Sequence, residues 1–350
     1  MNAFRLGIVE GFYGKPWTWR EREQAAEFMA ANGYRTYLYA PKGDEFLRRR
    51  WREPWPEKTL HELRNLSACF RRLGLSFGVG LSPIDYDEDL IKKKIDEIIS
   101  LDVDHIAILF DDMKGDVPEL AGAQVKLVHA VAARWRHGRL SMCPTYYSLD
   151  PVLDRIFGLR PPEYLHELGQ SLDSAVEIFW TGERICSQSY STAHLEQIGA
   201  VLGRRPLLWD NYPVNDTETM SKVLHLRPFT GRPGALSAHL SGHLINPMLQ
   251  PVLSRVPALT LVESYRQGKA YSADQAFHSA AVAVLGKQLA ACIERDVVLF
   301  QDLGLGKIDP QIVSALRAEY STIAHPAAAE VVGWLDGAYT VTHEVVLGQQ

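Results

Sequence analysis

Two adjacent aspartates, Asp111 and Asp112, close the apolar run IAILFDDM at residues 106–113. Neighbouring carboxylates repel each other, and a regular strand would send their side chains to opposite faces of the sheet. An Asp pair that only caps a helix or shapes a turn is the ordinary explanation. The alternatives are acid–base or nucleophilic catalysis and the binding of a divalent cation. The polar residues that the fold brings beside the pair decide among these uses.

The elements that must position the pair follow a regular rhythm. Short apolar stretches, often rich in β-branched or aromatic residues, alternate with longer amphipathic ones, which is typical of a parallel sheet built from strand–helix units. Strands are expected in RLGIVEGF, TYLYAP, SFGVGLSP, HIAILFDD, RLSMCPTYY, AVEIFWTG, RPLLWDNYP and GALSAHLSGHLINP. Eight units over about 250 residues predict a (β/α)8 TIM barrel. A doubly wound open sheet is disfavoured, because the first turn, GFYGKPW, lacks a GxGxxG motif.

Helices are expected between these strands, among them ETMSKVLHL at residues 218–226 and a helix that starts near Met248. From about Tyr271 onward the strand-like stretches stop, and Ala-rich amphipathic segments follow. The sequence therefore predicts a (β/α)8 catalytic barrel at residues 1–268 and a small C-terminal helical domain at residues 269–350.

Active sites of such barrels lie at the carboxyl ends of the strands, so polar residues there carry more weight than elsewhere. These ends hold Glu10, Gly11, Tyr13, Tyr39, Lys42, Asp85, Asp111, Asp112, Tyr146, Tyr147, Trp180, Thr181, Trp209, Asp210, Asn211, Asp216, His243 and Asn246. Individually, Asn211 and Asn246 fit turns beside prolines, and Trp209 fits a core. Together, such carboxylates, amides and aromatic rings suit a carbohydrate ligand, because polar groups bind hydroxyls and rings cover the apolar face of a pyranose.

Three kinds of chemistry are conceivable for the two carboxylates. A divalent metal needs further carboxylate or His ligands at the same depth, whereas these strand ends offer mainly amides. A serine hydrolase needs a GxSxG elbow, which follows none of the strands. Glycoside hydrolysis fits better, but ordinary retaining enzymes place two carboxyl groups about 5 to 5.5 Å apart on opposite sides of the sugar. Adjacent aspartates do not straddle a sugar easily, so the nucleophile would belong to a 2-acetamido substrate.

Several strings resemble, in this order, the catalytic barrel of glycoside hydrolase family 84: GIVEGFYGKPW, YLYAPKGDEF, GLSP, ILFDDM, CPTYY, FWTG, WDNYPVND and INP. This family comprises O-GlcNAcases, related bacterial β-N-acetylglucosaminidases and hyaluronidase-like proteins. The resemblance covers residues 5 to about 250. It implies a retaining exo-β-N-acetylglucosaminidase that removes terminal β-linked GlcNAc from a glycoprotein or glycan, without a cofactor or metal.

The resemblance also implies roles for individual residues. Asp111 would orient the acetamido group so that its carbonyl oxygen attacks the anomeric carbon to give an oxazoline, and Asp112 would act as general acid and then as base. Tyr147 would hydrogen-bond the acetamido oxygen, and Trp209 would supply an aromatic wall. The ring hydroxyls and the acetamido group would be held by Gly11, Lys42, Asn211, Asp216 and Asn246. Because like charges favour protonation, we expect Asp111 to raise the pKa of Asp112.

Composition limits the partners. A formal net charge of -5 and a pI near 6.2 argue against nucleic acid. The four cysteines, Cys69, Cys143, Cys186 and Cys292, form no CxxC pair and are expected to be small buried residues. No signal-peptide core and no run of about 18 apolar residues are evident, which predicts a cytoplasmic location and no membrane partner. Only family analogy suggests a homodimer.

Two alternatives stay open at this point. A related hexosaminidase would act on free glycans or cell-wall fragments, and a GlcNAc-binding barrel would bind the sugar without turnover. The presence of both aspartates disfavours the second alternative, since binding alone needs no acid.

Overall fold

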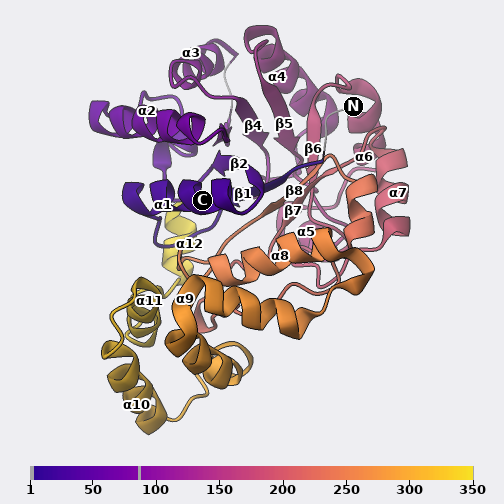
Figure 1. Ribbon diagram of the computed structural model, residues 1–350. Helices are drawn as coiled ribbons and strands as arrows, with labels where there is room; N and C mark the ends of the chain where they lie inside the picture. Colours follow the sequence, from indigo (N-terminus) through magenta and orange to yellow (C-terminus); the bar gives the residue numbers. More distant parts are fainter. Residues whose placement is uncertain (1–3, 86–87, 350) are drawn as a thin grey trace.

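The centre of the computed structural model, which describes residues 4–85 and 88–349, is a closed barrel of eight parallel strands (Figure 1). They are β1 (Leu6–Glu10), β2 (Tyr34–Tyr39), β3 (Ser76–Leu81), β4 (His105–Leu109), β5 (Arg139–Cys143), β6 (Glu177–Trp180), β7 (Leu207–Asp210) and β8 (Gly242–Ile245). The strands follow one another in chain order, and β1 pairs with both β2 and β8. This closure confirms the predicted (β/α)8 barrel.

The strands have no solvent-exposed face. The strands β1 and β4, with the sequences LGIVE and HIAIL, are buried at every position. A parallel strand between an inner core and an outer layer of helices needs apolar residues on both faces, which explains the uninterrupted apolar stretches. Because all strands run in one direction, the barrel gathers their polar carboxyl-terminal residues at a single rim.

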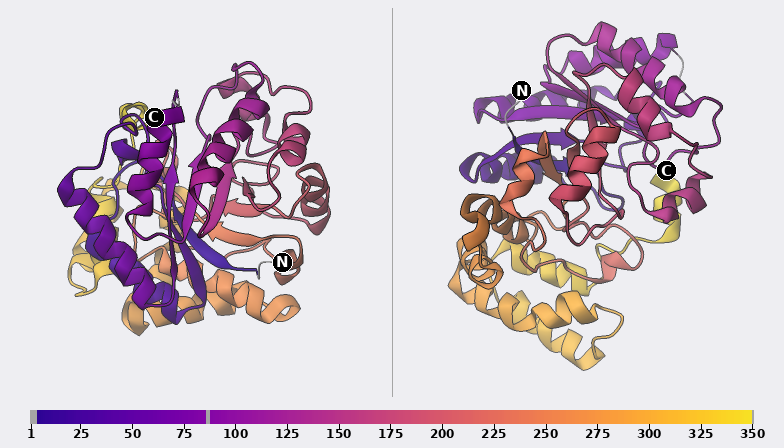
Figure 2. Two further views of the ribbon diagram at one scale, coloured as in Figure 1. Left: turned by 90° about the horizontal axis from the view of Figure 1, so that it is seen from above. Right: turned by 90° about the vertical axis from the view of Figure 1, so that its right-hand side faces the viewer.

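Helices cover the outside of the barrel (Figure 2). They are α1 (Trp19–Ala31), α2 (Glu57–Arg72), α3 (Glu88–Ile99), α4 (Leu120–Arg134), α5 (Pro151–Phe157), α6 (Tyr164–Ser171), α7 (Thr192–Val201) and α8 (Arg255–Gln267). Short 3-10 helices are η1 (Glu45–Leu47), η2 (Met220–Lys222), η3 (Gly234–Ala238) and η4 (Gly268–Ala270). A capping box between Thr18 and Glu21 fixes the start of α1. The chain between β1 and this cap therefore forms a defined loop at the rim.

The connection after β7 corrects one prediction, because residues 218–226 contain only the short η2 and no α-helix. Leu224 and Leu226 are fully buried in the core of the C-terminal helices. The backbone N–H of Leu224 donates to the Phe300 carbonyl at 3.0 Å, and that of Leu226 donates to the Gln301 side chain at 2.7 Å. Bonds to a distant part of the chain thus replace helical ones, which a local pattern does not reveal.

The eighth unit also differs from its prediction. Its expected strand segment opens with η3, and the helix expected near Met248 begins only at Arg255. The backbone N–H of Met248 donates to Ser254 Oγ, and that of Leu249 donates to Asn215 Oδ1, both at 3.0 Å. These side-chain acceptors hold the β8–α8 segment as a loop.

The C-terminal region is helical, as predicted. Its elements are α9 (Ala273–Val297), the π-helix η5 (Val298–Leu303), α10 (Pro310–Ser321), α11 (Pro326–Leu335) and α12 (His343–Gln349), hereafter the tail helices. They share a hydrophobic core with Leu224, Met248 and Leu253 from the rim loops of the barrel. In Figure 1 the yellow α12 returns toward α1 at the barrel. The tail helices therefore pack on the rim, while the division into two domains at residue 268 stays a prediction.

One helical stretch of the described residues, Ala273–Leu303, is long and apolar enough to cross a membrane. Of its most apolar part, 39% is buried against the rest of the chain. Gly286 interrupts the helix with φ 72° and ψ 162°. Length and composition alone do not distinguish this stretch from a core helix, so the expectation of no membrane partner stays a prediction.

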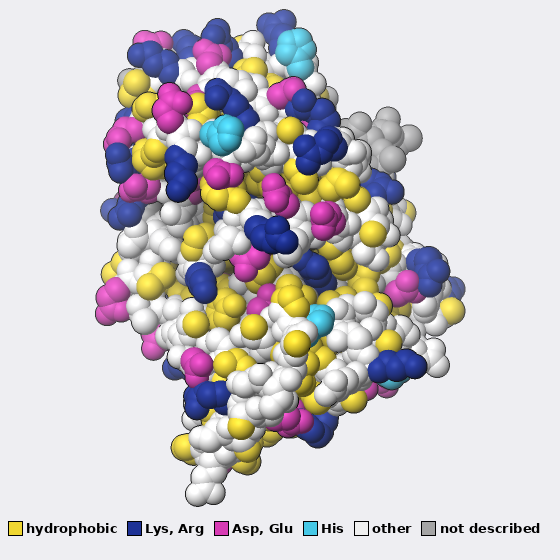
Figure 3. All heavy atoms as spheres, turned by 60° about the vertical axis from the view of Figure 1, so that its left-hand side comes forward, with side chains coloured by type: hydrophobic (Ala, Val, Ile, Leu, Met, Phe, Trp, Pro, Cys, Tyr) yellow, Lys and Arg dark blue, Asp and Glu magenta, His cyan; other side chains and the backbone are white. Residues whose placement is uncertain are grey.

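Charges of both signs are mixed on the surface. The chain has 37 Lys and Arg residues against 42 Asp and Glu residues, and both kinds are interspersed on the face drawn in Figure 3. On this face, ligand recognition therefore rests on local pockets rather than on a long-range field of one sign.

Candidate active site

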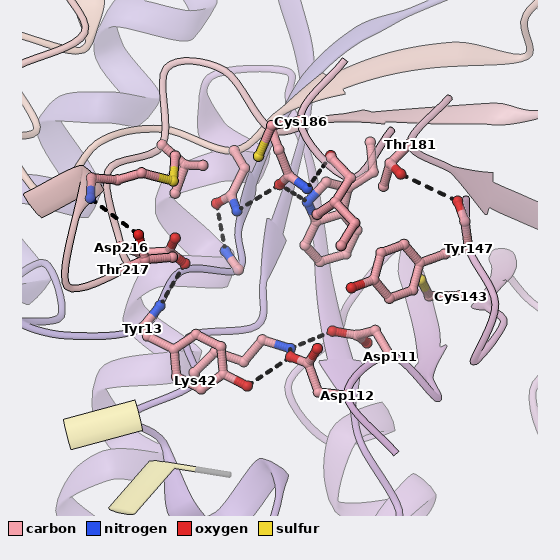
Figure 4. A pocket seen from close by; sticks show the side chains of 17 residues that line it. Tyr13, Lys42, Asp111, Asp112, Cys143, Tyr147, Thr181, Cys186, Asp216 and Thr217 are labelled. Atoms are coloured by element: carbon pink, nitrogen blue, oxygen red, sulfur yellow. Dashed lines mark hydrogen bonds and ion pairs between the residues drawn. The ribbon is translucent and has the colours of Figure 1, made fainter. Parts of the chain in front are cut away.

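A pocket opens at the carboxyl-terminal rim of the barrel (Figure 4). It is lined by Gly11, Tyr13, Lys42, Asp111, Asp112, Cys143, Tyr147, Thr181, Ile185, Cys186, Trp209, Asn211, Val214, Asp216, Thr217, Met220 and Asn246. Every residue that the sequence marked as catalytic or substrate-binding is among them. Their individual roles stay predictions, but the fold places them where they can act on one ligand.

The backbone explains how two adjacent carboxylates reach one pocket. β4 ends at Leu109, and Asp112 has a φ of 60°, in the left-handed region that Asp adopts more readily than most residues. The alternation of a strand therefore no longer applies at the pair. Figure 4 shows both carboxylates on the same side, beside Lys42.

Lys42 bridges the two carboxylates. Its Nζ forms an ion pair with Asp111 Oδ2 and lies 3.3 Å from Asp112 Oδ2. The lysine side chain is only 4% exposed, so its charge acts on the pair with little screening by water. The second oxygen of Asp111, Oδ1, is buried and has no hydrogen-bond partner among the described residues. A buried carboxylate oxygen is thus open to a donor from a ligand.

Tyr13 holds the second carboxylate and links it to the opposite side of the pocket. The Tyr13 hydroxyl donates to Asp112 Oδ2 at 2.6 Å, and its backbone N–H donates to Asp216 Oδ2 at 3.0 Å. Lys42 Nζ lies 5.5 Å from the centre of the tyrosine ring. The sequence placed Tyr13 at a strand end but gave it no role, because its partners are distant in the chain.

The protonation of Asp112 differs from the sequence expectation. Burial alone would raise its pKa, but the charge of Lys42, the hydrogen bond from Tyr13 and the charge of Arg48 outweigh burial and hold the pKa below its ordinary value. The prediction that Asp111 raises the pKa of Asp112 is therefore wrong for the protein without a bound ligand. The reason is the cation that the fold inserts between the two aspartates.

Other titratable groups of the pocket shift in the opposite direction. Burial, assisted by the charge of Asp112, raises the pKa of Asp216 to about 6, although the backbone N–H of Tyr13 opposes this rise. Burial and the charges of Asp112 and Asp111 raise the pKa of Tyr147 well above its ordinary value. Tyr147 is therefore a hydrogen-bond donor at all ordinary pH values.

The floor of the pocket is a network of amides around an indole ring. Asn246 accepts the backbone N–H of Gly11 at 3.3 Å and donates to Asn211 Oδ1 at 3.2 Å. Trp209 Nε1 donates to the same oxygen at 3.0 Å. A Cβ atom at Gly11 would lie 2.3 Å from the Trp209 ring, so only glycine fits against this face.

Some strand-end residues support the site from beneath instead of lining it. Arg232 forms a two-pronged pair with Asp210 at 2.8 and 2.9 Å, and His243 Nε2 lies 3.0 Å from Asp210 Oδ2. Burial alone would raise the pKa of Asp210, but these partners lower it to about 2. Glu10 is likewise paired with Arg22. These buried pairs fix the ends of β7 and β1, which carry Trp209 and Gly11.

The pocket also contains residues that sequence reasoning missed, among them Ile185, Val214, Thr217 and Met220. Ile185, Thr217 and Met220 lie outside the strings that carry the family resemblance, and Val214 lies within WDNYPVND but has an apolar side chain that suggests no role. Cys186 corrects a further expectation, because it is exposed and lines the pocket, whereas Cys69 and Cys143 are buried and Cys292 is half-buried. Within residues 4–85 and 88–349, no group of three or more His, Cys, Asp or Glu residues is placed to hold a metal ion.

Comparison with known proteins adds a family to this geometry. The family model described as β-N-acetylglucosaminidase matches residues 6–295. The chain belongs to this β-N-acetylglucosaminidase family of glycoside hydrolases. The resemblance to glycoside hydrolase family 84 is thereby confirmed.

Among named proteins, the chain is similar to the protein O-GlcNAcases of Mus musculus and Rattus norvegicus. Each is 28% identical over an alignment of 281 positions, and this alignment covers 76% of this chain and 30% of the relative. The chain therefore spans less than a third of these curated relatives. Among solved structures, a mutant O-GlcNAc hydrolase of Thermobaculum terrenum is similar, with a TM-score of 0.79 and 28% identity over 99% of this chain and 82% of the other.

Proposed function

We propose that this chain is an exo-acting, retaining β-N-acetylglucosaminidase of the O-GlcNAcase type that uses substrate-assisted catalysis. The observation that carries the proposal is the Asp111–Lys42–Asp112 group, in which one buried oxygen of Asp111 lacks a partner among the described residues. Family membership supplies the sugar, a terminal β-linked N-acetylglucosamine.

The nucleophile that attacks the anomeric carbon belongs either to the enzyme or to the substrate. An enzymatic nucleophile would stand across the sugar from the acid. Asp216 is the remaining carboxylate of the lining, and its Oδ2 already accepts the Tyr13 backbone N–H at 3.0 Å. We therefore assign Asp216 to hydroxyl binding, and the acetamido oxygen of the substrate to the attack.

In the first step, the acetamido carbonyl oxygen forms a bond to the anomeric carbon while the glycosidic C–O bond breaks. Asp112 gives its proton to the departing oxygen. The open oxygen of Asp111 accepts the acetamido N–H, which increases the electron density on the attacking carbonyl. Tyr147, kept protonated by its raised pKa, donates to the acetamido group. The product is an N-protonated oxazoline, whose N–H stays hydrogen-bonded to the ionised Asp111, and a released aglycone.

In the second step, water attacks the anomeric carbon from the face that the aglycone left. Asp112, now ionised, takes a proton from this water, and the bond between the anomeric carbon and the oxazoline oxygen breaks. The acetamido group is regenerated, and two inversions give net retention. Gly11, Lys42, Trp209, Asn211 and Asn246 hold the sugar through both steps.

Substrate binding has to change the protonation of Asp112. In the protein alone, Lys42 and Tyr13 keep its pKa low. A sugar that engages Lys42 with its hydroxyls and displaces water raises this pKa, because both changes disfavour the charged carboxylate.

This pKa change predicts that the pH profiles of kcat/KM and of kcat fall at different pH values on their high-pH side. The acid works only when protonated, so activity falls as the pH rises through its pKa. The limb of kcat/KM reports the free enzyme, in which the pKa is low, and the limb of kcat reports the complex. We expect the kcat limb at least about one pH unit above the kcat/KM limb. Superimposed limbs from full pH profiles would contradict the proposed rise.

The first test of the proposal compares two chromogenic substrates. We expect 4-nitrophenyl β-N-acetylglucosaminide to be hydrolysed with a kcat/KM at least about 1,000-fold above that of the matching β-glucoside, because only the first carries an intramolecular nucleophile. Fluorine atoms on the acetyl group weaken this nucleophile and should lower the rate stepwise. Equal cleavage of both substrates would exclude substrate assistance, and GlcNAc binding without turnover would favour a binding protein.

The aglycone and the cellular setting are separate proposals. We propose GlcNAc-bearing glycoprotein or glycan substrates, with protein-linked GlcNAc preferred because curated relatives are protein O-GlcNAcases. Rates on a GlcNAc-serine peptide and on chitobiose would rank these substrates against cell-wall fragments. The cytoplasmic location, the absence of nucleic-acid and membrane partners and the homodimer stay predictions.

A further inference from the structure

The last of the tail helices reaches the loop that carries Tyr13. Gln349 Oε1 accepts the backbone N–H of Gly14 at 2.8 Å, and Gln349 Nε2 donates to the carbonyl oxygen of Gly14 at 3.1 Å. One side-chain amide thus satisfies both polar backbone groups of one residue. The Gly14 backbone has a φ of 96°, which other residues rarely adopt, so this loop conformation is a specific one.

Apolar and aromatic side chains pack against the same loop. A Cβ atom at Gly14 would lie 2.8 Å from Val341 Cγ2 and 2.8 Å from Leu249 Cδ2, so the loop is in close contact with both the tail and the β8–α8 loop. Val341 is fully buried. Lys15 Nζ lies 5.0 Å from the centre of the Tyr339 ring. The loop after β1 is therefore held from two sides.

The tail helices also form hydrogen bonds with two other rim segments. Trp334 Nε1 donates to the Ser221 carbonyl at 3.0 Å, downstream of Asp216. The Glu330 carboxylate accepts the backbone N–H groups of Val252 and Leu253, both at 2.8 Å, in the β8–α8 loop that follows Asn246. The same C-terminal region thus contacts each of the three loops that follow β1, β7 and β8.

These contacts converge on the proposed acid. Tyr13 precedes Gly14 directly and is hydrogen-bonded to Asp112 through its hydroxyl and to Asp216 through its backbone. A shift of the Gly14 peptide changes the position of the Tyr13 backbone first, and with it the 2.6 Å bond to Asp112. The sensitivity of such bonds to small displacements gives a remote contact a kinetic effect.

We propose that the tail helices position the catalytic site, and that Gln349 is a positioning residue that sets the Tyr13–Asp112 hydrogen bond. The inference rests on the proposed function only in that Asp112 is taken as the acid. Gln349 is not among the lining residues of the pocket. It is hydrogen-bonded to Gly14 and also lies beside Gly43, where a Cβ atom would be 3.2 Å from Gln349 Nε2. We assign its effect to Tyr13, because both hydrogen bonds are made to the neighbour of that residue.

The test is Gln349→Ala in the full chain, with Leu347→Ala as control, because Leu347 lies on the same helix and is 55% exposed. We expect kcat/KM on 4-nitrophenyl β-N-acetylglucosaminide to fall about tenfold in Gln349→Ala, as for the loss of two hydrogen bonds. The Tyr13 bond lowers the pKa of Asp112. Its loosening should therefore move the high-pH limb of kcat/KM upward, and Leu347→Ala should leave activity and limb unchanged.

A double-mutant cycle separates positioning from general loosening. If Gln349 acts through Tyr13, the Gln349→Ala change has little further effect in a Tyr13→Phe background. Additive effects would overturn the proposal, as would a lower melting temperature without a moved limb. NMR titration of carboxyl-labelled Asp112 needs no turnover and should give a higher pKa in Gln349→Ala. An unchanged titration would overturn the inference even if the wild type lacked the proposed activity, which is a separate failure.

Discussion

In Asp112→Asn, kcat/KM is expected to fall about 10⁴-fold on a GlcNAc-serine peptide and about 10²-fold on 4-nitrophenyl β-N-acetylglucosaminide, the usual range for loss of a general acid. An alkoxide leaves only when protonated, whereas nitrophenolate leaves with little help. The asparagine keeps the size of the side chain, and it tolerates the left-handed backbone at this position. The variant should therefore fold normally and lose only the proton transfer. Initial rates on the two substrates, measured side by side, give the two ratios.

The matched control is Asp116→Asn, which removes an exposed carboxylate from the same loop. It should retain wild-type rates on both substrates. If Asp112→Asn loses the same factor on both aglycones, Asp112 does not protonate the leaving group. Rates within about threefold of the wild type on both would remove it from the mechanism, since acid–base catalysis is typically worth at least about 100-fold.

The second large effect is expected from Lys42→Met. Lys42 is the cation that touches both carboxylates and, in the proposed complex, a sugar hydroxyl. Loss of hydrogen bonds to a charged group predicts a kcat/KM about 100-fold lower at neutral pH. Without this charge the pKa of Asp112 rises, because Lys42 is the strongest influence that lowers it. The high-pH limb of kcat/KM should therefore move to higher pH, which a full pH profile would measure.

The unfolding free energy of Lys42→Met provides an independent test of the role of Lys42. Removal of one partner from a buried ion pair costs about 3 kcal/mol of unfolding free energy. In Lys42→Met the folded-state pKa of Asp112 is raised, and a raised carboxyl pKa adds stability as the pH falls. The deficit relative to wild type should thus be largest at alkaline pH and shrink on acidification. Lys126→Met, at an exposed position of α4, should show neither effect.

The sequence predicted the barrel because each strand is buried on both faces. HIAIL and LGIVE therefore read as strands without tertiary information. Residues 218–226 were predicted wrongly, since their backbone groups bond to residues 300 and 301 rather than along a helix. Local periodicity predicts an element only where local bonds decide its backbone.

The same distinction applies to the pocket. Residues in recognisable strings at strand ends, such as Asp111, Lys42 and Asn246, could be placed together from strand order alone. The role of Tyr13 depends on a partner 99 residues away. The lowered pKa of Asp112 depends on Lys42 lying between two charges, and adjacency in the sequence pointed the other way. The sequence therefore did not reveal which residues of different rim loops lie close together in the pocket.

The contact between Gly14 and Gln349 joins residues that lie 335 positions apart in the chain. Such a contact forms late, because ordering a loop of that length has an entropic cost that earlier contacts have to offset. Tyr13 therefore depends for its orientation on a contact between its neighbour Gly14 and the last of the tail helices. The geometry of the proposed acid therefore depends on the folding of the tail helices as well as on that of the barrel.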